Sequence, residues 1–276
     1  MGAKRSRTAQ AVAAQRAVLD RLGVIDEPYA RRMLTPPMSA VASIAARLPG
    51  AARGRWVTLA GCAGAVQWFD AQIVAALDEG IDQVATIGAG YDTRAWRFAR
   101  DGVRFFELDL VTTQADKIRR SPRPGPIFVT ADLSTDRSID VLHAGGLDAA
   151  RPTMFVLEGL TMYLSAPILR RQLSELAAGS AGGSRLVADF YPPPASGTSR
   201  NRRQLRLQRL ARIGSGEGLT LQVGRSDAAA LLAESGWHVD DQVGFQEAAR
   251  RRVPPGSGLP IDAVNDEKTL IAAHLV

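Results

Sequence analysis

A short apolar segment that runs into a glycine turn, followed by a second apolar segment that ends in acids, constrains this chain most. Residues 84–87 lead directly into Gly88-Ala89-Gly90, and residues 105–108 contain Glu107 and precede Asp109. Glycines let the backbone approach a ligand closely, and an acid about 20 residues further on accepts hydrogen bonds from ribose hydroxyls. The two segments therefore predict a βαβ unit that holds a nucleotide-bearing cofactor.

The glycine turn departs from the dinucleotide fingerprint, because Thr93 stands where its third glycine belongs. More than 80 residues precede the turn, whereas dinucleotide domains often begin near the N-terminus. Both features favour S-adenosylmethionine over NAD, and its adenosine needs the same acid. A βαβ turn without a ligand is the structural alternative.

The composition is that of an ordinary globular protein with a large core: 276 residues, 46% of them hydrophobic and 22% charged. No apolar run approaches the ~18 residues that a membrane span needs. The basic N-terminus lacks the apolar stretch of a signal peptide. The single cysteine, Cys62, excludes an internal disulfide and a cysteine-rich metal site. We therefore expect a cytoplasmic protein without a membrane partner.

The net charge of +6 comes almost entirely from arginine, since only Lys4, Lys117 and Lys268 are lysines. The densest basic cluster spans residues 200–212 and has no interleaved aromatic residues. Binding of single-stranded nucleic acid usually combines basic grooves with aromatic stacking platforms. The cluster is therefore interpreted as a solvated helix face, and no nucleic acid partner is expected.

Strand-like and helix-like segments alternate after residue 80, which predicts a parallel, doubly wound α/β sheet. The expected strands are residues 83–87, 103–108, 127–131, 154–157, 184–190, 237–243 and 269–275. The expected helices are residues 8–34, 38–48, 67–79, 94–99, 112–120, 138–143, 166–178 and 227–234. Pro36-Pro37 is expected to break the first helix.

The last two strands have no clear helix between them, so they are expected to pair antiparallel. A Rossmann-like seven-stranded sheet with an antiparallel last strand is the fold class of class I methyltransferases. We expect residues 1–80 to form an N-terminal helical cap and residues 81–276 to form the catalytic domain. An insertion at about residues 192–225 follows the fifth strand and is expected to cover the ligand crevice as a lid. A plain surface excursion is its alternative.

Four acids follow four successive strands, so they should gather along one edge of the sheet. They are Asp92, Asp109, Asp132 and Glu158. Such acids suit a cationic, ribose-bearing ligand. They also suit a divalent metal, but no histidine or cysteine joins them, and no metal is predicted. The three histidines, His143, His238 and His274, fall away from the ligand loops and are expected to be structural.

These segments resemble the leucine carboxyl methyltransferase family, and within it the bacterial S-adenosylmethionine-dependent enzymes of secondary metabolism. The matching segments are residues 8–30, which include Asp26-Glu27-Pro28-Tyr29-Ala30, and residues 88–94, 106–109, 132–133 and 158–164. The resemblance implies that S-adenosylmethionine is the cofactor. It places Asp109 at the ribose, Asp132 and Leu133 beside adenine, and Glu158 in contact with the cofactor. The remaining expected cofactor-binding residues are Gly88, Ala89, Gly90 and Asp92 of the glycine turn.

One departure from the family pattern concerns the residues before Asp70, where the family usually carries Arg-Thr-Arg and this chain has Ala65-Val66-Gln67. The leading arginine of the family pairs with the methionine carboxylate of the cofactor. The possible substitutes are Gln67, Arg55, Lys4, Arg5 and Arg7. If none replaces it, the chain is a degenerate relative that binds the cofactor weakly or not at all and serves as a binding or regulatory protein.

The chemistry of methyl transfer limits the catalytic residues. Transfer from a sulfonium needs a collinear arrangement in a dry pocket. A carboxylate acceptor is already deprotonated at neutral pH, whereas a hydroxyl usually needs a base. The catalytic candidates are Tyr163, Asp189 and Tyr191, which follow the fourth and fifth strands. We expect the acceptor to be a carboxylate or hydroxyl of a small molecule.

Overall fold

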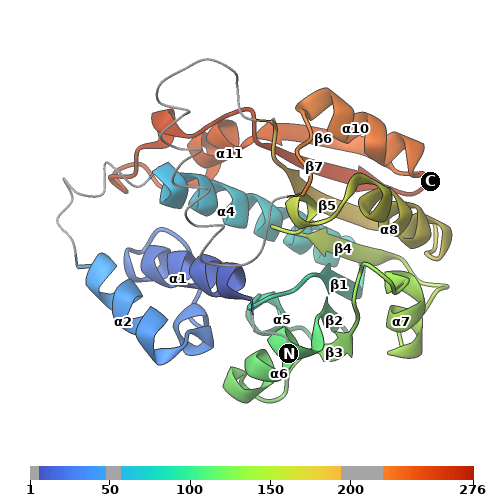
Figure 1. The fold of residues 1–276 in the computed structure, drawn as a ribbon, viewed down its shortest axis with the longest axis horizontal. Helices are drawn as coiled ribbons and strands as arrows, with labels where there is room; N and C mark the ends of the chain where they lie inside the picture. The colour runs from blue at the N-terminus through green and yellow to red at the C-terminus, as the bar shows by residue number, and fades with distance from the viewer. Residues whose placement is uncertain (1–5, 48–56, 194–219) are drawn as a thin grey trace.

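A seven-stranded sheet forms the centre of the computed structural model, which describes residues 6–47, 57–193 and 220–276 (Figure 1). The strand order is β3-β2-β1-β4-β5-β7-β6. The strands are β1 (Gln83–Ile87), β2 (Arg104–Asp109), β3 (Ile127–Thr130), β4 (Thr153–Leu157), β5 (Arg185–Phe190), β6 (His238–Gly244) and β7 (Thr269–His274).

Helices cover both faces of this sheet (Figure 1). The α-helices described are α1 (Arg7–Arg21), α2 (Pro36–Ala45), α4 (Val57–Asp78), α5 (Arg94–Arg97), α6 (Val111–Arg120), α7 (Ser138–Ala144), α8 (Ala166–Ala178), α10 (Arg225–Glu234) and α11 (Phe245–Arg252). Short 3-10 helices are η1 (Ala30–Met33), η2 (Thr161–Tyr163) and η3 (Ile261–Ala263).

The direction of β7 decides which residues share the functional edge of the sheet. Strands β1 to β5 pair parallel, whereas β7 runs antiparallel to both β5 and β6. Thr269 at the start of β7 is therefore paired with Phe190 at the end of β5 and with Gly244 at the end of β6. The predicted fold class is confirmed, and residues just before β7 lie beside those that follow β5.

The core has two halves, one on each face of the sheet. Alternate residues of a strand point to opposite faces, so Val84 joins the half built with α1, α4 and α11, while Ile87 joins the half built with α7, α8 and α10. All of β1 is buried. Strands covered on both faces read as continuous apolar runs, which is why the central strands were readable from sequence.

The N-terminal region differs from the single helix expected over residues 8–34. Helix α1 ends at Arg21, and Gly23 turns the chain with a positive φ of 68°. A residue without a Cβ adopts this backbone conformation at no steric cost. Pro36 does not break a helix but begins α2. The first N–H groups of a helix have no partner within the helix, so the missing N–H of proline costs no hydrogen bond there. The helix predicted from the apolar periodicity therefore extends 13 residues beyond the observed end of α1 at Arg21.

Helices α4 and α11 are the other corrections. Helix α4 begins at Val57, ten residues before the predicted start at residue 67, and α11 lies between β6 and β7, where no helix was expected. The two cross closely at Gly64, where an added Cβ would lie 2.5 Å from the backbone nitrogen of Ala249. Glycine has a low helix propensity, so tertiary packing and not local preference explains this stretch of α4.

The described residues leave part of the sequence predictions open. Residues 200–212 and most of the predicted lid at 192–225 lie outside them. Helix α4 packs against α1, β4 and β5, so the predicted cap of residues 1–80 and the strands share one half of the core. The division at residue 80 stays a prediction. No helix within the described ranges is long and apolar enough to cross a membrane.

Candidate functional site

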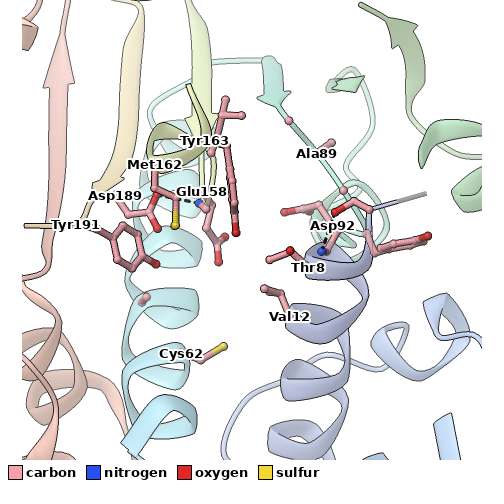
Figure 2. A pocket seen from close by; sticks show the side chains of 18 of the residues that line it. Thr8, Val12, Cys62, Ala89, Asp92, Glu158, Met162, Tyr163, Asp189 and Tyr191 are labelled. Atoms are coloured by element: carbon pink, nitrogen blue, oxygen red, sulfur yellow. Dashed lines mark hydrogen bonds between the residues drawn. The ribbon is translucent and has the colours of Figure 1, made fainter. Parts of the chain in front are cut away.

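A cavity of about 1190 Å³ lies at the sheet edge where β1, β2, β4 and β5 end. Figure 2 shows Val12 of α1 and Cys62 of α4 on opposite sides of it. Every cofactor-binding and catalytic candidate from the sequence lines this cavity: Gly88, Ala89, Gly90, Asp92, Asp109, Asp132, Leu133, Glu158, Tyr163, Asp189 and Tyr191. The topology therefore gathers them in one place, and their roles stay predictions.

The glycine loop is held between β2 and the segment after β4. Gly88 has a φ of +68°, and a Cβ there would lie 2.8 Å from Cδ1 of Leu160. The backbone N–H of Gly90 donates to Asp109 Oδ2 at 2.6 Å, and that of Leu110 donates to Oδ1 at 2.7 Å. Burial raises the pKa of Asp109, and these two bonds oppose the rise. The loop and the acid at the end of β2 thus form one fixed unit.

Thr93, which replaces the third glycine of the dinucleotide fingerprint, has a structural task of its own. Its side chain is fully buried, and its hydroxyl donates a hydrogen bond to the Glu27 carboxylate. This bond joins the glycine loop to the segment between α1 and η1. A glycine at this position could not make it.

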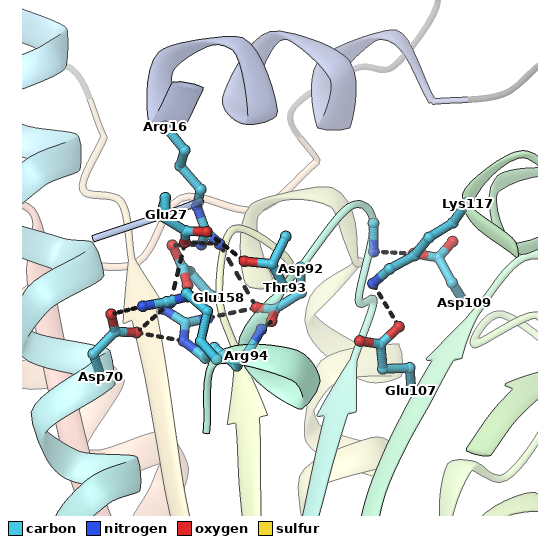
Figure 3. Close-up of polar contacts among 12 residues, drawn as sticks. Arg16, Glu27, Asp70, Asp92, Thr93, Arg94, Glu107, Asp109, Lys117 and Glu158 are labelled. Atoms are coloured by element: carbon cyan, nitrogen blue, oxygen red, sulfur yellow. Dashed lines mark hydrogen bonds and ion pairs between the residues drawn. The ribbon is translucent and has the colours of Figure 1, made fainter. Parts of the chain in front are cut away.

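An ionic cluster connects this loop to the N-terminal helix (Figure 3). It contains three guanidinium groups and four carboxylates, from Arg16, Arg94, Arg97, Glu27, Asp70, Asp92 and Glu158. We call this set the ionic cluster. Because the carboxylates outnumber the guanidiniums, the cluster carries an excess of negative charge when all its members are ionised.

Arg94 lies at the centre of the ionic cluster. Its guanidinium reaches Asp70 at 2.6 Å, Asp92 at 2.5 Å and Glu158 at 2.6 Å. Burial by itself would raise the pKa of Asp92, but the charges of Arg94 and Arg16 lower it well below its usual range. At Glu158, burial again acts to raise the pKa of the carboxyl group, but the charges of Arg16 and Arg94 outweigh it and the pKa is lowered. Both carboxylates are therefore ionised at neutral pH.

Arg16 is the site residue that sequence reasoning missed. It projects from α1 into the ionic cluster, with Nη2 2.6 Å from Glu158 and Nη1 3.2 Å from Glu27, and it lines the cavity. Its position is four residues after Val12 and three before Leu19, on the apolar face of α1. An arginine on such a face was the available signal, because a buried charge needs partners.

The expected substitutes for the missing family arginine do not occupy the cavity within the described residues. Lys4, Arg5 and Arg55 lie outside those residues. Arg7 and Gln67 are described but are not among the lining residues. The Gln67 amide instead donates to the Ala63 carbonyl at 3.3 Å. Ala65 itself lines the cavity, and among the described lining residues Arg16 is the one arginine.

The end of β3 supplies Asp132 and Leu133 at one end of the cavity. Asp132 Oδ1 accepts hydrogen bonds from the backbone N–H of Ser134 at 2.9 Å and from its hydroxyl at 2.6 Å. These bonds lower the pKa of Asp132. Leu133 is buried beside it and belongs to the half of the core built with α7 and α8. A charged and an apolar side chain thus lie next to each other.

The end of β5 forms the other end of the cavity. Asp189 Oδ1 accepts the backbone N–H of Gly159 at 2.8 Å, and the neighbouring Tyr191 hydroxyl lowers the pKa of the same carboxyl group. Burial, reinforced by the charge of Glu158, raises the pKa of Asp189 to about 7. This carboxyl group therefore changes its charge near neutral pH, unlike those of Asp92 and Glu158.

Lys268, directly before β7, is a second cation that sequence reasoning did not place at the site. Its Nζ lies 5.1 Å from the ring centroid of Tyr191 and 5.7 Å from that of Phe245. No described carboxylate forms an ion pair with this ammonium group, and the charge of Asp189 acts on it from a longer distance. Burial lowers the pKa of Lys268. The antiparallel course of β7 brings this ammonium group to the cavity.

Comparison with known proteins assigns the family. Residues 7–177 match the model of the leucine carboxyl methyltransferase family. The chain belongs to this family. The expectation of this family, drawn from the glycine loop and the strand-end acids, is confirmed.

Relatives agree with the family, and a solved structure agrees with the fold. A Mycolicibacterium paratuberculosis protein provisionally named an S-adenosyl-L-methionine-dependent methyltransferase is 34% identical over 216 residues, 75% of this chain and 68% of that protein. A Mycobacterium bovis protein of the same provisional name is 31% identical over 98% of this chain and 91% of its own. The crystal structure of a Thermobifida fusca protein, provisionally named a methyltransferase, has a TM-score of 0.59 at 15% identity. The match covers 99% of this chain and 95% of that protein, and it supports the fold alone.

Proposed function

We propose that this protein transfers the methyl group of S-adenosylmethionine to an oxygen of a small-molecule acceptor. Its family makes it an S-adenosylmethionine-dependent methyltransferase. The nature of the acceptor is our inference. The observation that carries it is a cavity in which Asp92, Asp109, Asp132 and Glu158 lie toward one end, while Asp189 and an ammonium group without an ion pair to any described carboxylate lie at the other.

The charges around the cavity fit the cofactor. Among the described lining residues, two cations, Arg16 and Lys268, face five carboxylates, those of Asp92, Asp109, Asp132, Glu158 and Asp189. S-adenosylmethionine carries a sulfonium and an ammonium charge against one carboxylate, so it brings net positive charge to an acidic site. Electrostatic complementarity of this kind favours the charged cofactor over neutral nucleosides.

Each part of the cofactor has a matching group. Asp109 accepts the ribose hydroxyls, and Asp132 and Leu133 flank the adenine. The glycine loop allows the backbone to approach closely, and Asp92 and Glu158 face the cationic portion. Arg16 binds the methionine carboxylate in place of the arginine that is absent at Ala65, since it is the arginine among the described lining residues.

The mechanism follows from what the residues around the acceptor can do. The bound cofactor supplies an electrophilic methyl group on sulfur. The protein aligns the acceptor oxygen with that methyl group and excludes water. Met162, Tyr163, Tyr191 and Phe245 line the cavity and provide an apolar surround at this end. No proton transfer is needed if the acceptor is a carboxylate.

Lys268 favours a carboxylate-bearing acceptor. An ammonium group between aromatic rings, without an ion pair among the described residues, can bind one oxygen of a carboxylate while the other oxygen attacks. A hydroxyl acceptor is the second candidate, because Asp189 has a pKa of about 7 and could accept its proton. The two candidates predict products of different stability.

The test combines binding with methyl transfer. Titration calorimetry with S-adenosylhomocysteine should show binding, and NAD should give none. Transfer of labelled methyl to a panel of aliphatic and aromatic acids and phenols should then yield a base-labile ester from an acid. A base-stable ether would favour the hydroxyl candidate.

The same experiment distinguishes an active methyltransferase from a degenerate relative that serves as a binding protein. A protein that fails to bind S-adenosylhomocysteine, or binds it without transfer to any member of the panel, would count against the enzyme and for a binding protein. Label that appears in nucleic acid and falls steeply with salt would overturn the small-molecule acceptor.

A further inference from the structure

Two of the three histidines meet at the opposite end of the sheet from the cavity. His238 begins β6, His274 ends β7, and the register pairs them directly across the two antiparallel strands. Lys268 at the cavity precedes Thr269, and His274 lies five positions after Thr269 along the strand. At about 3.4 Å per residue, the histidines lie about 17 Å further along β7. They therefore belong to neither the cofactor nor the acceptor region.

A bulge in β6 brings a carboxylate to this pair. Val239 pairs with Ala273 and Asp241 with Ala272, so Asp240 is the extra residue without a partner in the ladder. Bulges are known to redirect a side chain near functional sites. Here Asp240 Oδ1 lies 2.7 Å from Nδ1 of His274, and the two imidazole rings are 5.2 Å apart between centroids.

The three side chains offer the donor set of a late first-row metal ion. One ligand atom from each of His238, Asp240 and His274 lies within 4.8 Å of the others. Imidazole nitrogen and carboxylate oxygen are ordinary zinc ligands at about 2.0–2.2 Å. His238 and Asp240 are exposed, so their side chains can close on an ion, and a fourth position stays open to water.

We propose that His238, Asp240 and His274 form a binding site for Zn²⁺ that joins β6 to β7. Strand β6 is the edge of the sheet, and an edge strand is held by one neighbour only. A metal ligated from both strands would resist the separation of β6 from β7. The site is independent of methyl transfer, since none of its ligands lines the cavity.

The rival explanation is a local hydrogen bond between Asp240 and His274 with no metal. The sequence makes the two easy to distinguish, because it contains one other histidine, His143, and one cysteine, Cys62, which is half-buried and lines the cavity at the other end of the sheet. Few other residues can bind zinc through nitrogen or sulfur. Zinc binding by the protein can therefore be traced to a small number of positions.

The experiment is titration calorimetry with ZnCl₂ on protein that carries no polyhistidine tag, followed by thermal unfolding with and without zinc. The wild-type protein should bind one ion and unfold at a higher temperature with it. His238→Gln, Asp240→Asn and His274→Gln should each lose about tenfold or more in affinity. His143→Gln and Asp241→Asn, the matched controls outside the site, should bind as the wild type does.

Circular dichroism without metal should show the same fold for every variant, which separates ligand loss from misfolding. Absence of zinc binding in the wild type would overturn the site. So would unchanged affinity in the double variant His238→Gln/His274→Gln, or in Asp240→Asn. Methyltransferase activity is not needed for any of these measurements, so the outcome is separate from that of the proposed function.

Discussion

The two ends of the cavity differ in whether their charged side chains are paired within the fold. At the cofactor end, Arg94 contacts three carboxylates, and Asp92 and Glu158 are held ionised by arginines within the fold. At the acceptor end, Lys268 has no described carboxylate within ion-pair distance, and Asp189 titrates near neutral pH. Charged groups that are paired within the fold hold one another in position, because removing one partner leaves the others buried without a counter-charge. Charges left without an ion pair are available to a ligand.

The largest effect should follow from breaking the paired end. Arg94→Met leaves Asp70, Asp92 and Glu158 without their shared guanidinium, so the free energy of unfolding should fall by about 3–5 kcal/mol. Arg100→Met is the matched control, since its pair with Asp78 is exposed and should contribute at most about 1 kcal/mol. Urea denaturation of both variants measures this. Equal losses in the two would mean that burial does not distinguish the pairs.

A loss of affinity should follow from removing the acid at the end of β2. Asp109→Ala should weaken binding of S-adenosylhomocysteine at least about tenfold, since each hydrogen bond from a ribose hydroxyl to this carboxylate contributes about 1.5–3 kcal/mol. Calorimetry measures it, with the exposed Asp101→Ala as control. Unchanged affinity would show that this carboxylate serves only to fix Gly90 and does not touch the cofactor.

The titrating carboxyl of the acceptor end should affect stability with pH. Its folded pKa of about 7 lies above the ordinary value of 3.8. The native state therefore binds more protons between about pH 4 and 7, and stability from this group is lost as pH rises through that window. Asp189→Asn keeps an acceptor for Gly159 and removes the charge. It should be more stable than the wild type at pH 8, by about 1–4 kcal/mol, and equal to it near pH 4.

Denaturation curves of both proteins at pH 4, 6 and 8 check this prediction. The other acids titrate alike in the two proteins, so their contributions cancel in the difference. A difference that does not change with pH would show that Asp189 stays ionised throughout, and would remove the argument for it as a proton acceptor.

The sequence allowed most of the sheet and its acids to be predicted, because these depend on local pattern. Buried parallel strands are continuous apolar runs, and the residues after them must share an edge. Arg16 and Lys268 could not be found this way. One arrives through the packing of α1 on the glycine loop, and the other through the reversed direction of β7. Helix α11 was missed because its eight residues are soon followed by the loop-like stretch at residues 254–258, and because contact with α4 stabilises it.

A smaller effect should follow from removing the charge at the acceptor end. Lys268→Met should raise the KM of an acid acceptor about tenfold and leave the affinity for S-adenosylhomocysteine unchanged. A phenol acceptor, if one is used, should be unaffected. Steady-state kinetics on this variant measures the KM of the acceptor, and calorimetry measures the affinity for S-adenosylhomocysteine. Weaker binding of S-adenosylhomocysteine with an unchanged KM of the acceptor would show that Lys268 contacts the cofactor and not the acceptor.

The smallest effect should come from restoring the family arginine. Ala65→Arg should change the affinity for S-adenosylhomocysteine by less than about threefold, because Arg16 already supplies a cation to the methionine carboxylate, and a second one adds little where the first bond is made. Arg16→Met should lose about tenfold in affinity, and Ala65→Arg in that background should recover it. Calorimetry of the three variants forms a closed cycle. A tenfold gain from Ala65→Arg alone would show instead that the wild-type protein lacks this contact, and that Arg16 serves only to hold Glu27 and Glu158 together.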